Sequence, residues 1–555
     1  MIPTRQGSKR RAAVAFVAVL WMVGLCMAGC GSGQSVSGAS GSGGSITIAA
    51  GSPPTSADQG LDFTTYGTEL YSVVNTPLLA YVRGVQGAAG SRIIPALASK
   101  LPKVSDSGTT YTFQLRKGLH YSNGQPVLAS DETYALERDL KIPWQAASFI
   151  SGFIKGASAY ANGKAKTISG ITTNDSPRTI VVHLTQPFAP IINVFALSGT
   201  APVPKSTPMS NQASRGTIGD GPYKWGGIEP GHTYTLVRNT KFDVSGLPRG
   251  HADKIIFNVN SNVLADAEAV LRNQQDVFDP TETLPGSIVG EVKADASSRY
   301  QAVPSDATSY FFFAVNRKPF SNIYARKAVL AALDLRALSR LDSGFIKEDC
   351  HLLPSGIPGH TDPATCAALT GHDPNGRPNM AVAKADMKKS GMIGQPVTVW
   401  GSEQSPIRQY VDYYTTVLNS LGFRTTEKIV SPGVYFATIG ASTTKPQTGW
   451  DEWVQDFPDP WDFMHLFTCE AGSTLNYGYV CDKHLDSTVK ALDTKPLAGR
   501  AGQWSALDRY AVAHAYYAAH GHQEFPKFYS NRLVFSRGVL SVEYQTDLTS
   551  LELKK

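Results

Sequence analysis

Hydrophobic positions along the chain alternate between two periods, a period of two that is typical of strands and a period of three to four that is typical of helices. Alternating or continuous apolar runs predict strands at 46–50, 79–81, 111–116, 178–185, 219–225, 233–238, 310–316 and 397–400. Helical periodicity predicts helices at 66–79, 130–140, 266–271, 325–337, 408–421 and 501–519. The two kinds of element are mixed without strict βαβ repetition, so the class is α/β or α+β with several lobes.

Local signals refine some of these boundaries. Ser130 is a plausible N-cap for the helix at 130–140, because two acidic residues follow it in the first turn. Gly118, Gly124 and Gly221 are expected in turns that need a positive φ. Glu229-Pro-Gly231 predicts a turn between two strands.

The amino terminus has a different pattern. Four basic residues lie in the first 11 positions, and residues 12–29 form an uncharged apolar run. This run has the length of a minimal membrane-spanning helix, but the basic start and the small residues before Cys30 favour a secretory signal. Met-Ala-Gly-Cys30 resembles the lipobox of bacterial lipoproteins, with Met27 where Leu is usual. We therefore expect a signal peptide at 1–29 and lipidation of Cys30; Cys26 follows bulky Leu25 and is a poorer candidate.

The stretch after Cys30 supports an anchor. Twelve of the 15 residues from 31 to 45 are Gly or Ser, a composition that behaves as a flexible coil. The alternative is an ordinary disordered terminus. From residue 46 onward there is no further apolar run of membrane length, so we expect a soluble body outside the membrane.

The remaining cysteines fit an oxidising compartment. Cys350, Cys366, Cys469 and Cys481 are an even number and allow three connectivities. The pairs Cys350–Cys366 and Cys469–Cys481 are favoured because each closes a short loop. A zinc site is the alternative, but the Cys-x2-Cys spacing typical of such sites is absent.

Composition and charge narrow the function. The chain has 555 residues, of which 42% are hydrophobic and 17% charged, so it can build large cores. Its formal charge is +6, and without the four basic residues of the leader 47 basic residues face 45 acidic ones. This near-neutral body shows no electrostatic footprint for nucleic acid.

Several motifs, in order, resemble one family. They are 92–98 (RIIPALA), 107–118, 121–126 (YSNGQP), 131–138, 219–224 (GDGPYK), 229–231 with 238–239, 316–320, 326–328, 334–336, 453–460 (WVQDFPDP) and 476–477. Together they resemble the extracytoplasmic solute-binding proteins of ABC importers, in the peptide/nickel-binding family 5. The resemblance covers nearly all of 46–540.

The resemblance implies a fold and a domain plan. The expected class is α/β, with the two-lobed, type II periplasmic-binding-protein fold called a Venus flytrap and an extra subdomain. The expected boundaries are a lipidated Cys and tether at 30–45, lobe I at 46–78, 190–303 and 518–555, the extra subdomain at 79–189, and lobe II at 304–517. The chain would cross the hinge near 303 and 517.

The resemblance also implies a binding site. Asp456 occupies the position where peptide-binding members hold the ligand's α-ammonium, and a buried carboxylate facing an ammonium makes a charge-assisted hydrogen bond. Trp453 occupies a position that lines the pocket. Further candidates are Asn476, Tyr477, Trp450, Trp400 and Tyr66. Asp459 is expected to cap or turn the chain.

Other chemistry is weakly supported. His514, His520 and His522 could suggest a metal, but their spacing and Gly521 favour a solvated helix end. His465 and His484 flank the second cysteine pair and are not expected to be ligands. Gly-x-Ser-x-Gly, His-Glu-x-x-His and Walker A motifs are absent from the sequence, so we expect neither an enzyme nor a cofactor.

The expected function is therefore capture of oligopeptides outside the cytoplasmic membrane and delivery to an ABC permease by a lipid-anchored monomer. The alternatives are a non-peptide solute (a metal chelate, an oligosaccharide or an opine-like molecule) on the same fold, and a surface lipoprotein used for signalling or adhesion. A surface hydrolase is the third choice.

Overall fold

The structure is a computed structural model and describes residues 43–555 except 86–88, 143, 374, 473–474 and 544–545. The predicted leader, Cys30 and most of the predicted tether lie outside the described residues. None of the helices in the described part of the chain has the length and apolar character needed to cross a bilayer.

One large sheet organises the described chain. Its eleven strands follow the order β15-β14-β16-β12-β17-β11-β1-β10-β9-β8, and β13 pairs with β17. The bounds are β15 (Arg424–Val430), β14 (Pro396–Ser402), β16 (Thr448–Val454), β12 (Tyr300–Phe313), β17 (Tyr517–Tyr529), β11 (Val277–Phe278), β1 (Ser45–Ala50), β10 (Lys254–Val259), β9 (Thr233–Arg238), β8 (Tyr223–Glu229) and β13 (Ile346–Lys347).

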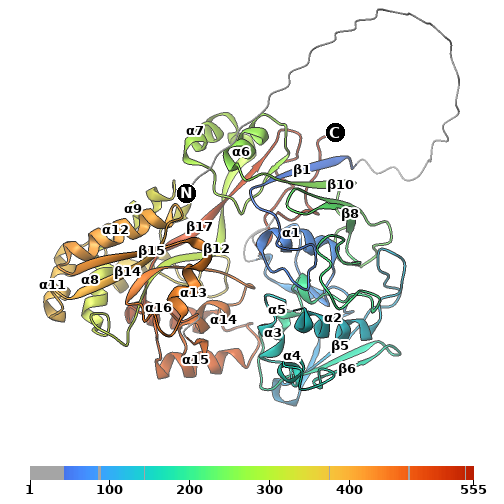
Figure 1. The fold of residues 1–555 in the computed structure, drawn as a ribbon, viewed down its shortest axis with the longest axis horizontal. Coiled ribbons are helices and arrows are strands. Elements are labelled where there is room, and N and C mark those ends of the chain that lie inside the picture. The colour runs from blue at the N-terminus through green and yellow to red at the C-terminus, as the bar shows by residue number, and fades with distance from the viewer. Residues whose placement is uncertain (1–42, 86–88, 143, 374, 473–474, 544–545) are drawn as a thin grey trace, which may run out of the picture. The chain divides into compact units, whose positions relative to one another are not determined.

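Two long strands join the two ends of this sheet. β12 and β17 pair antiparallel from Tyr300 opposite Phe528 to Phe312 opposite Tyr517, with two register shifts between. We call β11, β1, β10, β9 and β8 the β1 side, and β16, β14 and β15 the β16 side (Figure 1). The predicted hinge positions near 303 and 517 fall within these strands. The domain boundaries themselves stay a prediction.

A second sheet lies in the segment predicted as an extra subdomain. Its order is β4-β5-β7-β6, and a two-stranded sheet pairs β2 with β3. Tyr111 and Phe113 of β5 point into its core, as their alternation predicts. The bounds are β2 (Leu79–Tyr81), β3 (Ile93–Pro95), β4 (Lys103–Ser105), β5 (Thr110–Gln114), β6 (Ile171–Asn174) and β7 (Thr179–His183).

Helices cover the sheets. On the β16 side, α12 packs on β14, β15 and β16, and α16 packs on β17; Figure 1 draws α9 and α12 above these strands and α15 and α16 below them. The helices are α1 (Thr65–Val74), α2 (Ala129–Lys141), α3 (Ser148–Ser151), α4 (Ala157–Ala161), α5 (Ile191–Val194), α6 (Val263–Leu271), α7 (Gly286–Asp295), α8 (Ile323–Ala332), α9 (Leu335–Leu341), α10 (Cys366–Thr370), α11 (Met380–Ser390), α12 (Ile407–Ser420), α13 (Tyr435–Gly440), α14 (Trp461–Met464), α15 (Lys483–Asp493) and α16 (Ala501–Ala513). The predicted α/β class is confirmed.

Three predicted elements have different bounds. The strand predicted at 310–316 begins ten residues earlier, at Tyr300, because its first part pairs with β17. The helix predicted at 325–337 is two helices, with Asp334 accepting the Ala337 N–H (3.0 Å) as the N-cap of the second. The strand predicted at 219–225 runs from Tyr223 to Glu229.

The helix predicted at 501–519 is wrong beyond residue 513. α16 ends at Ala513, Ala515 has a φ of 50°, and β17 begins at Tyr517. The alanine-rich sequence favours a helix, but pairing with β12 overrides this local propensity. The solvated helix end predicted for His520 and His522 is wrong for the same reason, since both lie buried on β17.

Two local predictions are also wrong. Leu128, not Ser130, is the N-cap of α2, and its N–H donates to the Asp131 carboxylate (2.9 Å). Ser130 instead donates to Asp175 (2.9 Å). Gly118 and Gly124 have positive φ as expected, but Gly221 does not. A Cβ at Gly221 would collide with the backbone of Val73, so this glycine permits close packing against α1.

Both favoured cysteine pairs are disulfides. Cys350 and Cys366 have Cα atoms 5.7 Å apart, and Cys469 and Cys481 have Cα atoms 4.6 Å apart.

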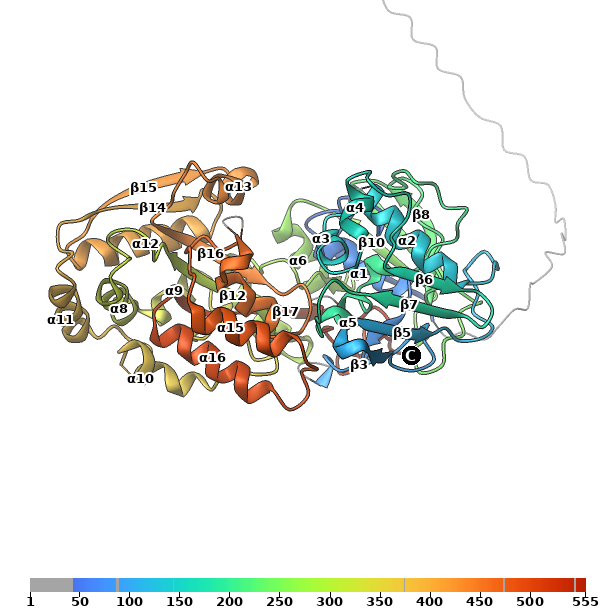
Figure 2. The ribbon, with the colours of Figure 1, turned by 90° about the horizontal axis from the view of Figure 1, so that it is seen from below.

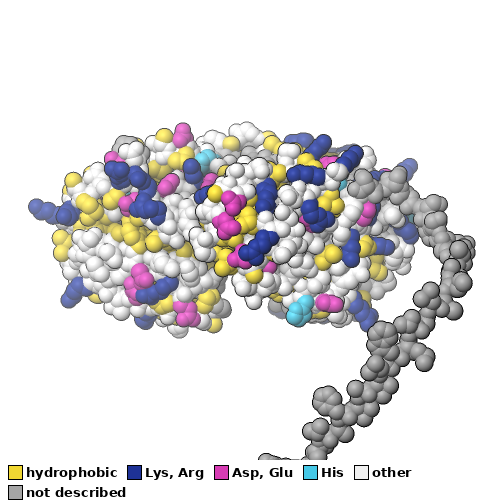
Figure 3. Space-filling view, turned by 90° about the horizontal axis from the view of Figure 1, so that it is seen from above, with side chains coloured by type: hydrophobic (Ala, Val, Ile, Leu, Met, Phe, Trp, Pro, Cys, Tyr) yellow, Lys and Arg dark blue, Asp and Glu magenta, His cyan; other side chains and the backbone are white. Residues whose placement is uncertain are grey.

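The surface carries charges of both signs. Basic and acidic side chains are interspersed on the face in Figure 3, as the near-neutral charge of the body predicts.

A buried ion pair ties α2 to the loop after β1. Arg138 donates two hydrogen bonds to Asp58, of 2.8 and 2.5 Å, and the two side chains are 1% and 0% exposed. Arg138 also donates to the carbonyl oxygens of Pro208 and Ser210. Removal of one partner from such a pair leaves a buried charge without compensation.

We therefore expect Asp58→Asn to lower the free energy of unfolding by about 3–5 kcal/mol, measured by urea denaturation. Asp243→Asn is the control, because it removes an ion pair with Arg249 whose side chains are 60% and 86% exposed, and it should leave the unfolding midpoint unchanged. Equal effects of the two substitutions would contradict the prediction.

Candidate functional site

A cavity of about 760 Å³ lies between the segment around α3 and the segment from β16 to α15. We call it the Asp456 cavity. Figure 1 draws α3 near α14, Figure 2 draws α5 on the side that faces α15, and the Ala189 N–H donates to the Asp493 carbonyl (2.6 Å). Its lining includes Ser148, Phe149, Phe153, Gln186, Trp453, Asp456, Trp461, His465, Glu470, Lys483, Asp486, Lys490 and Asp493.

Asp456 is half-buried and sits in the loop that follows β16. Burial raises its pKa from 3.8 to about 7. Among the described residues, no group donates a hydrogen bond to its carboxylate. An ionised carboxylate in this position is therefore short of compensation, and a cation in the cavity would supply it.

Asp462 holds Asp456 and Trp453 in place from behind. Its Oδ2 accepts the Asp456 backbone N–H (2.7 Å) and the Trp453 indole N–H (3.2 Å). Its pKa is raised, first by burial and then by the neighbouring Asp456. Asp459 accepts the Trp461 N–H (2.9 Å) two residues along the chain, which is a turn contact and not a cap, since Pro460 is the N-cap of α14.

Aromatic rings from both segments form a wall of the cavity. Phe149 lies 5.4 Å from Phe457, and Phe153 lies 6.0 Å from Trp461, measured between ring centroids. His465 stacks on Trp461 at 4.2 Å, and burial lowers its pKa to about 4, so it is neutral at pH 7. The wall can therefore contact apolar side chains of a ligand, while the charged groups near α15 contact polar ones.

A second cavity of about 280 Å³ lies next to β16. We call it the Glu452 cavity. Trp450 and Glu452 line it, since alternate residues of a strand point to the same face. Burial raises the pKa values of Glu452 and of Asp342, another lining residue, to about 7. Thr283, Tyr410, Tyr435, Phe436 and Gln523 also line it.

The edge of β16 is partly open between these cavities. β12 pairs with β16 along residues 448–454, whereas β14 pairs with it only at Thr448 and Gly449. After Gly449 no strand within the described chain pairs with that edge, although the Trp450 carbonyl accepts from the Tyr435 hydroxyl (2.6 Å) and the Glu452 N–H donates to the Asp451 carboxylate (2.8 Å). An extended segment can add to such an edge.

The other predicted site residues lie elsewhere. Trp400 is buried on β14 with the Lys428 ammonium 4.9 Å from its ring, and Tyr66 donates to Glu282 (2.6 Å). Asn476 donates to the carbonyl oxygens of Thr468 and Val480. None of these three lines either cavity.

Tyr477 lies one layer behind the Glu452 cavity. Its ring stacks on Phe436, one of the lining residues, at 6.1 Å. Of the seven predicted site residues, the structure thus brings Asp456 and Trp453 to one cavity and Trp450 to the other. The ligand contacts themselves stay predictions.

Sequence reasoning missed several lining residues, among them Phe149, Phe153, Trp461, Lys483 and Lys490. Phe149 and Phe153 precede Asp456 by some 300 positions in the sequence, so no local pattern links them. Trp461 directly follows the motif at 453–460, and this position is a local signal from which it could have been predicted.

Comparisons with known proteins identify the family of the chain. The model of the bacterial extracellular solute-binding proteins, family 5, matches residues 92–474. The chain belongs to this family. The resemblance inferred from the sequence is thereby confirmed, and the chain is a solute-binding protein of an extracytoplasmic family.

Relatives of this family 5 protein are named for the binding of peptides. Dipeptide-binding protein DppE of Bacillus subtilis (strain 168) is 26% identical over 409 residues, 71% of this chain and 72% of the relative. The dipeptide-binding protein of Escherichia coli (strain K12) is 24% identical over 452 residues, 76% of this chain and 78% of the relative.

Solved structures share the two-lobed fold. Clavulanic acid biosynthesis oligopeptide binding protein 2 has a TM-score of 0.83 at 22% identity, covering 92% of this chain and 96% of its own. DppA of Helicobacter pylori in complex with the peptide STSA has a TM-score of 0.68 at 18% identity, covering 92% and 98%. These likenesses establish the fold.

The role of Asp462 can be tested by stability. Burial raises the pKa of Asp462 and so favours its neutral form relative to an ordinary aspartate, and asparagine resembles that neutral form. We expect Asp462→Asn to change the free energy of unfolding by less than about 1 kcal/mol, whereas Asp462→Leu leaves the Trp453 and Asp456 N–H groups without an acceptor and costs about 2–4 kcal/mol. Urea denaturation at pH 7 measures both, and equal effects would contradict this role.

Proposed function

We propose that this family 5 protein captures oligopeptides by their free amino end outside the cytoplasmic membrane and delivers them to an ABC permease. The observation that carries the proposal is the Asp456 carboxylate, which lines a large cavity and lacks a hydrogen-bond donor among the described residues. The names of the relatives, dipeptide- and oligopeptide-binding, support the same ligand class.

The charge of the site favours an ammonium group. A carboxylate with a raised pKa gains most from a cation that donates hydrogen bonds to it, and an α-ammonium does both. Asp462 behind it adds a second buried acid at hydrogen-bond distance from the Asp456 backbone. The Asp456 carboxylate therefore selects against ligands whose amino end is blocked.

Two features of the protein can bind the rest of the peptide. Its backbone can pair with the open edge of β16, and its side chains can occupy the Asp456 cavity, whose volume of about 760 Å³ exceeds that of one side chain. Backbone pairing does not depend on the side chains, and a roomy pocket tolerates water. Binding is thus broad in sequence and strict about the amino end.

Ligand capture shifts the population of the two lobes toward a closed state, and the permease then takes the ligand. The aromatic contacts of Phe149 with Phe457 and of Phe153 with Trp461 link the segments that would close. The protein acts as a monomer without a cofactor and catalyses no reaction, while a separate subunit hydrolyses ATP.

The amino end of the chain completes the proposal. Lipidation of Cys30 holds the body at the outer face of the membrane, and the Gly/Ser-rich stretch at 31–45 lets it reach the permease.

Calorimetric titration tests the role of Asp456. We expect a peptide with a free amino end to bind, and its N-acetylated form to bind at least about 30-fold more weakly, because the buried charge pair is lost. Asp456→Asn should weaken binding of the free peptide to a similar degree. Asp493→Asn removes an acid elsewhere in the same cavity and should preserve the discrimination.

The same titration at several pH values is a further check. The ligand-free pKa of Asp456 is about 7, and an ammonium partner would lower it. Below pH 7 binding must therefore release a proton from Asp456. The affinity for the peptide should then fall by up to about tenfold for each pH unit by which the pH is lowered. Asp456→Asn should abolish this dependence. Equal affinity for free and acetylated peptides, with no effect of Asp456→Asn, would overturn the proposed role.

The anchor is tested independently. We expect Cys30→Ser to abolish incorporation of labelled fatty acid and to release the protein from the membrane fraction of the expressing bacterium. Cys26→Ser changes the other leader cysteine and should leave both unchanged. Labelling that persists in Cys30→Ser would contradict lipidation at this residue.

A further inference from the structure

Three side chains converge at a place that lines neither cavity described above. Asp349 follows β13, His360 lies in the loop after it, and His522 lies on β17, beside Lys347 of β13. One ring nitrogen of each histidine and one carboxylate oxygen of Asp349 lie within 4.8 Å of one another. Asp349 and His522 are buried, and His360 is half-buried.

The hydrogen bonds fix which atoms carry protons. His360 Nδ1 lies 2.7 Å from the Leu353 carbonyl oxygen, which only accepts, so Nδ1 donates and Nε2 keeps a lone pair in the neutral ring. The Thr308 hydroxyl donates its proton to the Leu352 carbonyl (2.7 Å). It must therefore accept from His522 Nδ1, 2.9 Å away, which leaves His522 Nε2 as the free nitrogen.

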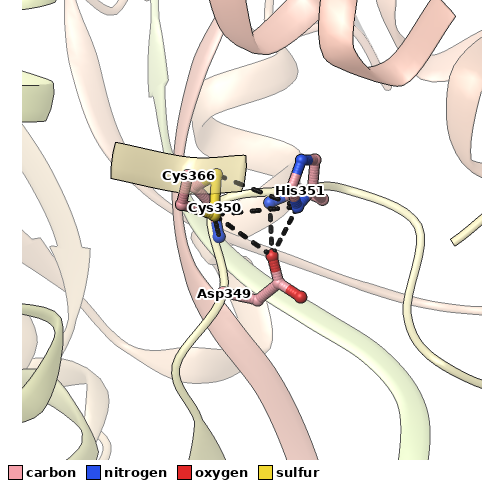
Figure 4. A group of neighbouring side chains, drawn as sticks. All are labelled: Asp349, Cys350, His351 and Cys366. Atoms are coloured by element: carbon pink, nitrogen blue, oxygen red, sulfur yellow. Dashed lines mark hydrogen bonds and ion pairs between the residues drawn. A yellow bond between two sulfur atoms is a disulfide. The ribbon is translucent and has the colours of Figure 1, made fainter. Parts of the chain in front are cut away.

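The Asp349 carboxylate is oriented in the same manner. Its Oδ1 accepts from the His351 ring (2.7 Å) and from the His351 backbone (3.0 Å). Figure 4 shows this contact beside the Cys350–Cys366 disulfide, with the second oxygen pointing away from His351. That oxygen, Oδ2, lies 3.2 Å from His522 Nε2. Neither atom has a hydrogen-bond partner in the described structure, although both are buried.

When the His522 ring is neutral, two electron-pair donors face each other at this distance, and either a proton or a metal ion must lie between them. Two ligands of one tetrahedral zinc ion, each 2.0–2.1 Å from it, lie about 3.3 Å apart. The free atoms of Asp349 and His522 therefore already have the separation of two zinc ligands, and a ring nitrogen of His360 is near enough to be the third. The other atom of each ligand is held by a hydrogen bond, as is usual for metal ligands.

The local charge accommodates a divalent ion. Asp349 contributes one negative charge, and Asp508, whose carboxylate accepts the Leu352 and Leu353 N–H groups, lies on the other side of His351.

We propose that Asp349, His360 and His522 bind a zinc-class divalent transition-metal ion. This ion is resident rather than transported, because its ligands lie outside both cavities. It would tie the loop at 349–360 to β17, one of the two long strands that join the β1 side to the β16 side. The fourth coordination position is left for water, and half-buried His360 gives the ion a route of entry.

The test is metal content. The mature protein, without a histidine tag, is dialysed with ZnCl2, freed of loose metal and measured by mass spectrometry for zinc per chain. We expect one zinc per chain in the wild type and near zero in His360→Gln and His522→Gln. His514→Gln is the matched control, because His514 Nδ1 also contacts a carbonyl oxygen, of Tyr510 (2.8 Å), but belongs to no such cluster; it should keep one zinc.

Circular dichroism verifies that each variant folds. His360 lies in a loop and is half-buried, so His360→Gln carries the test if His522→Gln does not fold. Zinc should raise the melting temperature of the wild type and of His514→Gln, but not that of His360→Gln. The proposal is overturned if the wild type binds no stoichiometric zinc, or if His360→Gln retains as much as His514→Gln. In the first case a proton, not a metal, joins Asp349 to His522; in the second, the zinc does not use His360.

Discussion

The ladder between β12 and β17 is the constraint on which the rest of the structure depends. On its other edge β12 holds β16, the strand that leads to Asp456, and β17 holds β11 and, through it, β1. Both sides of the sheet are therefore registered to the same pair of strands. Any change in the twist of this pair would move the two sides relative to each other, so a hinge motion between them would be absorbed near these strands.

A second theme is the concentration of buried acids along β16 and the loop after it. Burial raises the pKa values of Asp451 and Glu452 as well as those of Asp456 and Asp462. Asp451 is satisfied by the Tyr310 hydroxyl (2.6 Å), and Glu452 by Ser309 (3.0 Å). Asp456 is the one of the four for which the described residues supply no donor. The segment thus contains three acids that donors of the protein satisfy and one, Asp456, that the described residues leave without a donor.

Much of this could be predicted from the sequence, and the failures have physical causes. Strands with clear alternation, such as the one around Phe113, and the motif that carries Asp456 were identified because their signals are local. The residues 517–519 were assigned to a helix, since alanine favours helices and pairing with β12 leaves no trace in the sequence. Phe153 and the cluster of Asp349 with His522 were missed because only the folded chain brings these distant segments together.

The sheet also has a consequence for how the protein is made. β1, at the start of the described chain, pairs with β11, and β11 pairs with residues 528–529 near the carboxyl end. This part of the fold cannot close until almost the whole polypeptide has left the ribosome, and contacts of such large sequence separation form slowly. β1 has both of its partners, β10 and β11, once residue 278 is available, whereas the pairing of β11 with β17 must wait for the carboxyl end of the chain.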